Sequence, residues 1–127
     1  MKMKAIITAA MLAAIALPGI ASAKSKADNL VAKADAKPQS CVQLRQIHET
    51  KVLNDSTIDF HMLGGKVYRN TLPYRCPSLG FEESFAYKTS LSELCSTDII
   101  TVLNTAGGLN RGASCGLGQF QEMEAKK

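Results

Sequence analysis

The sequence contains no tryptophan, and its aromatic residues are only three tyrosines and four phenylalanines among 127 residues. A small domain with so few large apolar side chains has a small core, so we expect a folding free energy of only several kcal/mol. The chain also lacks an apolar run long enough to span a bilayer. The run from Ala5 to Leu17 covers about 13 residues, whereas a transmembrane helix needs roughly 20.

This apolar run lies in a segment with the composition of a secretory signal peptide. Two lysines precede the run, Pro18-Gly19 ends it, and Ala21-Ser22-Ala23 supplies the small residues of a cleavage site. We therefore expect residues 1–23 to be removed by cleavage between Ala23 and Lys24. The mature protein is then periplasmic or secreted, with no stable membrane insertion after cleavage.

The predicted domain has no excess of basic residues. The net charge of +4 falls to +2 once Lys2 and Lys4 leave with the signal peptide, and from Cys41 onward nine basic residues balance nine acidic ones. The remaining excess lies in residues 24–40, whose composition of Ala, Lys, Asp and Pro predicts a flexible tether. A neutral domain offers no electrostatic footprint for nucleic acid, so we expect no nucleic-acid partner.

The four cysteines lack the spacing of a metal site. Cys41, Cys76, Cys95 and Cys115 are separated by 35, 19 and 20 residues, whereas zinc ligands usually include close C-x-x-C pairs. In an exported chain they predict two structural disulfides, which stabilise a domain with a small core. Four cysteines allow three pairings, among which the sequence does not choose. We favour sequential pairing, Cys41 with Cys76 and Cys95 with Cys115.

Residues 41–123 have the pattern of a single disulfide-stabilised β domain, followed by a charged tail at residues 124–127. We expect about six short strands, at residues 46–53, 56–62, 66–72, 84–89, 98–103 and 115–122. The apolar residues that follow Asp98 predict a central strand buried on both faces. Residues 104–114, which contain three glycines, predict the longest loop. The pattern favours an all-β fold, a small antiparallel β-barrel or sandwich.

Asn54-Asp55 predicts a two-residue hairpin loop between the first two strands. With such a loop the numbers of opposite residues add to 109. Glu49 then faces Phe60 on the inner side of the sheet, and His48 faces His61 on the outer side.

The turn Leu63-Gly64-Gly65 leaves two registers open for the third strand. With a three-residue loop, Tyr68 faces Phe60 in the core and Arg69 faces Asp59 outside. With a two-residue Gly-Gly loop, the two faces of the third strand are exchanged. We favour the first register because it buries the tyrosine.

The two histidines are candidate metal ligands. If His48 lies opposite His61, their Cβ atoms are about 5 Å apart, and Asp59 projects from the same face. Two imidazoles and a carboxylate suit zinc or another divalent metal. The alternative is a polar outer face on which Asp59 pairs with Arg69. We expect no metal here, because structural sites usually need four ligands and catalytic sites a sheltered open position.

No other motif assembles an active site. The segment Gly112-Ala113-Ser114-Cys115-Gly116 matches the G-x-S-x-G nucleophile elbow, but no histidine follows Ser114. We expect no catalytic residue and no cofactor. The sequence therefore favours a binding or accessory module without catalysis of its own, with an envelope protein, a polymer or a small molecule as ligand. The alternatives are a metal-dependent or hydrolytic enzyme using the face of His48 and His61, and a small protein inhibitor presenting residues 104–114.

Four segments together resemble a family of small exported proteobacterial four-cysteine proteins that is catalogued only as a domain of unknown function. They are Gly65-Lys66-Val67-Tyr68-Arg69-Asn70-Thr71-Leu72-Pro73, Arg75-Cys76-Pro77, Leu94-Cys95 with Asp98-Ile99-Ile100-Thr101-Val102, and Cys115-Gly116-Leu117-Gly118-Gln119-Phe120. The resemblance covers nearly all of residues 41–123. It implies a bacterial envelope protein and one folded unit that contains all four cysteines. It implies no catalytic residue, since none is assigned in that family.

Overall fold

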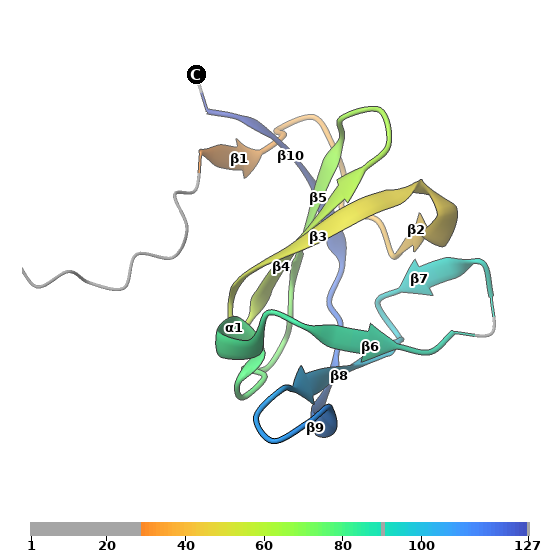
Figure 1. The fold of residues 1–127 in the computed structure, drawn as a ribbon. Helices are drawn as coiled ribbons and strands as arrows, with labels where there is room; N and C mark the ends of the chain where they lie inside the picture. The colour runs from red at the N-terminus through yellow and green to blue at the C-terminus, as the bar shows by residue number, and fades with distance from the viewer. Residues whose placement is uncertain (1–28, 90, 127) are drawn as a thin grey trace, which may run out of the picture.

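The computed structural model describes residues 29–89 and 91–126, so the expected signal peptide and its cleavage site lie outside the described residues. The described chain is mostly β-structure, in several antiparallel sheets (Figure 1), and it contains two disulfides. The arrangement resembles a sandwich, and these residues form no closed barrel, which confirms the predicted all-β class. Within the same residues, no helix has the length and hydrophobicity needed to cross a membrane.

The described residues contain ten strands and two single helical turns. The strands are β1 (Leu30–Ala32), β2 (Cys41–Gln43), β3 (Ile47–Asn54), β4 (Thr57–Met62), β5 (Val67–Thr71), β6 (Phe85–Tyr87), β7 (Glu93–Cys95), β8 (Ile99–Asn104), β9 (Asn110–Gly116) and β10 (Phe120–Ala125). The helical turns are η1 (Leu44–Gln46) and α1 (Leu79–Glu82).

The strands form three sheets around one core. A five-stranded sheet has the order β1-β10-β5-β4-β3, a three-stranded sheet the order β6-β8-β9, and β2 pairs with β7. Phe60 of β4 and Phe120 of β10 are fully buried, with ring centroids 5.3 Å apart. The ring of Phe85 on β6 lies 6.4 Å from that of Phe60, so aromatic edge-to-face contacts join the two larger sheets.

The third strand has the register favoured above. Tyr68 pairs with Phe60 and Arg69 with Asp59, and Tyr68 is buried. Gly64 and Gly65 adopt φ values of 90° and 96°, which the turn requires and glycine allows without strain. The expectation that Asp59 is exposed is wrong, because only 2% of its surface is accessible.

The predicted register of the first hairpin is wrong along most of its length. Residue numbers add to 109 only where Ile47 faces Met62, and a β-bulge at His48 then shifts the pairing by one residue. Glu49 therefore faces His61, while Phe60 faces Thr50. The observed register keeps Glu49 out of the core, where the predicted one would have buried its charge.

The second half of the expected tether is part of the five-stranded sheet. Leu30–Ala32 forms β1 and pairs with β10, and Gln39 exchanges two backbone hydrogen bonds of 2.8 Å with Phe120. The Lys33 ammonium adds an ion pair of 3.3 Å with Glu122. The folded unit thus starts before Cys41, and β1 covers an edge that β10 would otherwise expose.

The expected long loop at residues 104–114 is instead mainly a strand. β9 begins at Asn110 and pairs with β8, so only residues 105–109 form the connecting turn. Gly107 and Gly108 adopt positive φ values there, of 74° and 116°. The chain then leaves β9 at Gly116 and enters β10 at Phe120, so the single strand expected at residues 115–122 is two strands.

The favoured disulfide pairing is also wrong. The bonds are Cys41–Cys95 and Cys76–Cys115, and no cysteine is free. Cys41 and Cys95 are opposite residues of the β2–β7 pair. Cys76 lies in the loop after β5, which this bond fastens to β9. The spacing of cysteines along the chain could not reveal a strand pairing of such long range.

Candidate binding site

The three candidate metal ligands, at which no metal is expected, are not brought together among the described residues. His48 occupies the bulge, and His61 faces Glu49 instead. Both carboxylate oxygens of Asp59 accept hydrogen bonds from the Arg69 guanidinium, at 2.8 and 2.9 Å, so the polar interpretation of this face describes Asp59 correctly. One group of three possible ligands in the described chain has its donor atoms within 4.8 Å of one another, and it includes none of His48, His61 and Asp59.

The two histidines still border one shallow pocket of about 390 Å³, together with Glu49 and Lys66. The Nε2 atom of His61 is buried without a hydrogen-bond partner among the described residues. A glutamate and a lysine beside the rings supply charges of both signs, and among the described residues neither histidine belongs to a group of three possible ligands with donor atoms within 4.8 Å of one another. This pocket offers no set of converging groups to a metal or a substrate.

Three further polar residues have structural contacts. Asp98 accepts a hydrogen bond of 2.7 Å from the backbone N–H of Cys95, as expected for a turn residue. Glu82 accepts hydrogen bonds from the N–H and the hydroxyl of Thr105 at 3.2 and 3.0 Å. Ser114 lies inside β9, so the G-x-S-x-G sequence has no strand-to-helix turn. Its hydroxyl is 3.0 Å from that of Thr101 on β8.

A different site lies on the outer face of the three-stranded sheet. It is an open groove of about 520 Å³, which we call the β8 groove. It is lined by Ala86, Tyr87, Lys88, Thr97, Asp98, Ile99, Thr101, Leu103 and Arg111. Residues of all three strands of this sheet contribute to it, β8 at the centre and β6 and β9 on either side.

The alternation of side chains along β8 produces the floor of this groove. Ile100 and Val102 are fully buried, so Ile99, Thr101 and Leu103 point to the opposite face. The expectation that this strand is buried on both faces is therefore wrong. Ile99 has 57% of its surface accessible, which leaves a large apolar side chain facing solvent at the groove.

Two cations flank the apolar floor. Lys88 directly follows β6, and Arg111 of β9 lies opposite Leu103 of β8. Neither has an ion-pair partner within residues 29–89 and 91–126. Asp98 is the only carboxylate among the described residues that line the groove, so the formal charge of the groove is +1. Because the Asp98 carboxylate also accepts a hydrogen bond from the backbone N–H of Cys95, part of its negative charge is already compensated.

Sequence reasoning missed the β8 groove because its parts come from three separated segments. The one available signal was the sequence Ile99-Ile100-Thr101-Val102-Leu103, in which Thr101 interrupts an otherwise apolar run. A polar residue at the middle of such a strand favours one exposed face. Lys88 and Arg111 carried no signal, since only the pairing of β6 and β9 with β8 brings them together.

Comparisons of the chain with protein-family models, with curated protein sequences and with solved structures found no match. The resemblance of the cysteine-containing segments to a family of exported proteins therefore stays a prediction.

Proposed function

We propose that the chain is a binding module of the bacterial periplasm, without catalysis of its own, and that it holds a small organic anion with an apolar body in the β8 groove. The observation that carries this proposal is that two cations, Lys88 and Arg111, line the same groove as the exposed apolar side chain of Ile99. A ligand that carries both a negative charge and an apolar body complements both features at once.

The proposed location rests on three supports. Two disulfides suit an oxidising compartment, where such bonds form and persist. Residues 1–23 have the pattern of a signal peptide. The resemblance to exported proteobacterial proteins points to the same compartment.

In the proposed complex, each part of the groove contacts a different part of the ligand. Ile99 and Leu103 contact the apolar body of the ligand, which stabilises binding by about 25 cal/mol for each Å² of apolar surface removed from water. Lys88 and Arg111 donate hydrogen bonds to its carboxylate or phosphate. A hydrogen bond to a charged group contributes about 1.5–3 kcal/mol, and at an exposed groove such as this one the lower end applies.

Calorimetry with three ligands of equal chain length tests the proposal. The mature protein should bind octanoate at low ionic strength, and octyl glucoside and octylamine much more weakly. Lys88→Met and Arg111→Met should each lower the affinity for octanoate roughly tenfold, which corresponds to 1.4 kcal/mol. Added salt should weaken binding in the wild type.

Two variants at exposed cations outside the groove serve as controls. Lys51→Met on β3 and Arg45→Met on η1 remove the same charges and should leave the affinity unchanged. If all four variants bind octanoate equally, or if octylamine binds as tightly as octanoate, the proposed function is wrong.

A further inference from the structure

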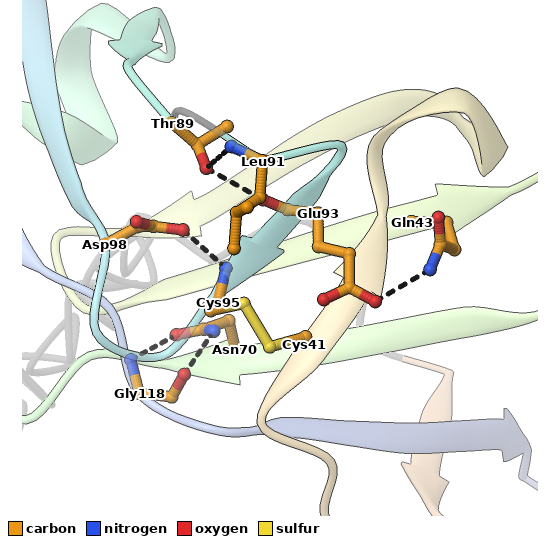
Figure 2. The surroundings of a disulfide bond; sticks show 9 residues. All are labelled: Cys41, Gln43, Asn70, Thr89, Leu91, Glu93, Cys95, Asp98 and Gly118. Carbon is orange, nitrogen blue, oxygen red and sulfur yellow. Dashed lines mark hydrogen bonds between the residues drawn. A yellow bond between two sulfur atoms is a disulfide. The ribbon is translucent and has the colours of Figure 1, made fainter.

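Cys41, Cys95 and the glutamate Glu93 lie on one face of the β2–β7 pair. Cys41 is opposite Cys95, and Gln43 is opposite Glu93 one step along the same face. The two sulfur atoms and a carboxylate oxygen of Glu93 all lie within 4.8 Å of one another. Figure 2 shows the Glu93 carboxylate between Gln43 and the disulfide.

The Cys41–Cys95 bond is the more accessible of the two disulfides. Cys41 and Cys95 are both half-buried, whereas in the other disulfide only Cys115 is half-buried and Cys76 is completely buried in the core. A dithiol reductant therefore reaches Cys41–Cys95 first. In that exchange the two cysteines gain two electrons and two protons as thiols, and the reductant becomes a disulfide. The exported chain also holds these residues as thiols before its first oxidation.

The backbone keeps the two thiols side by side once the bond between them is absent. Hydrogen bonds flank the cysteine pair on both sides, from Leu44 N to Ser92 O at 3.0 Å and from Ser96 N to Ser40 O at 2.7 Å. A tetrahedral zinc ion with Zn–S bonds of about 2.3 Å needs its two sulfurs roughly 3.8 Å apart. Rotation of the two side chains reaches that separation without breaking the strand pair.

Glu93 is held in place to serve as a third ligand. The side-chain amide of Gln43 donates a hydrogen bond of 2.8 Å to Glu93 Oε1, which leaves Oε2 without this contact (Figure 2). Hydrogen bonds of this kind orient carboxylate ligands in metal sites. Two thiolates and one carboxylate form a ligand set that suits zinc, with water in the fourth position.

We propose that the dithiol form of this chain binds one thiophilic divalent cation of the zinc type through Cys41, Cys95 and Glu93. Binding converts two thiols to thiolates and releases two protons. Exchange with a disulfide oxidant, which takes up the two electrons and becomes a dithiol, re-forms the Cys41–Cys95 bond, removes both thiolates and so expels the metal. The site is separate from the β8 groove, and its test does not depend on the proposed function.

Cobalt is the probe, because thiolate-bound tetrahedral Co²⁺ absorbs strongly in the near ultraviolet and the visible. The mature protein is reduced by a trialkylphosphine, freed of reductant without air and titrated with Co²⁺. We expect one equivalent of thiolate-bound cobalt, which zinc displaces, and no such absorption in the oxidised protein. Alkylation of the reduced protein followed by peptide mapping shows which cysteines were free.

Variants assign the ligands. Glu93→Gln keeps a partner for Gln43 but removes the carboxylate, and should weaken cobalt binding at least tenfold. Glu49→Gln, on an exposed part of β3, should not change it. The double variant Cys41→Ser/Cys95→Ser should lose the absorption completely. Binding that survives in this double variant would place the metal elsewhere and overturn the proposal.

If reduction unfolds the protein, circular dichroism tests the proposal instead of cobalt absorption. Zinc should then restore the native spectrum of the reduced wild type, since metal that binds only the folded state drives folding. It should not do so for Cys41→Ser/Cys95→Ser. A folded dithiol form that binds no cobalt, or an unfolded one that excess zinc fails to refold, contradicts the proposal.

Discussion

The substitution Asn70→Ala tests how the chain holds β10 against β5. Asn70 is fully buried, and its side-chain amide bonds both backbone groups of one residue on the neighbouring segment. Its Nδ2 donates to Gly118 O at 2.7 Å, and its Oδ1 accepts from Gly118 N at 2.8 Å (Figure 2). The side chain thus replaces a strand partner at the point where the chain passes from β9 to β10.

Alanine at this position removes both bonds and leaves the N–H and the carbonyl of the half-buried Gly118 without these partners. An unsatisfied buried group costs about 1–3 kcal/mol, and the lower part of that range applies to each half-buried group, so we expect a total loss of about 2–4 kcal/mol. A domain of this size has about 5–15 kcal/mol of stability. The midpoint of thermal unfolding should therefore fall by about 10–25 °C.

Urea unfolding followed by circular dichroism measures this loss as a lower midpoint with an unchanged m value. Asn110→Ala makes the same truncation at an exposed position of β9, and should change stability by less than about 0.5 kcal/mol. If Asn70→Ala were no more destabilising than Asn110→Ala, the assignment of Asn70 as a substitute strand partner would be wrong.

Three further predictions concern packing, charge and processing. A Cβ at Gly118 would collide with a carbonyl oxygen of β5, whereas one at Gly116 would meet open space. Gly118→Ala should therefore lower the free energy of unfolding, measured in urea, by about 1–3 kcal/mol. Gly116→Ala should lower it much less. Asp59→Ala leaves the mostly buried Arg69 guanidinium without the carboxylate of Asp59. Because Arg69 keeps some solvent contact, we expect the free energy of unfolding to fall by about 2–3 kcal/mol. A fall of less than about 0.5 kcal/mol would refute a structural role for the pair. N-terminal sequencing of periplasmic protein should begin at Lys24, and recovery of only the full-length chain would refute cleavage there.

Local signals predicted several features of the fold correctly. The Gly64-Gly65 turn and the need to bury Tyr68 gave the register of the third strand. Short strand signals and four cysteines in a small chain with a signal-peptide pattern were enough to predict an all-β, disulfide-stabilised class.

The errors have a common physical origin in long-range pairing. The bulge at His48 changes the register by one residue, and the local sequence carries no mark of it. Gly107 and Gly108 in the turn and Gly112 inside β9 concealed the β8–β9 hairpin, because a glycine such as Gly112 lowers the β propensity of a strand that its partner nevertheless forms. Both disulfides and the β8 groove depend on which strands meet, and hydrophobic periodicity does not specify that choice.

The binding of an organic anion in the β8 groove is tested most directly by mapping the ligand on the isotope-labelled mature protein. Backbone amide chemical shifts are followed by NMR during titration with octanoate. We predict saturable shifts concentrated at residues 86–88, 97–103 and 111, which disappear in the double variant Lys88→Met/Arg111→Met while its other signals stay in place. Saturable shifts centred on another surface, such as the pocket of His48 and His61, or shifts that persist in the double variant, would contradict the account.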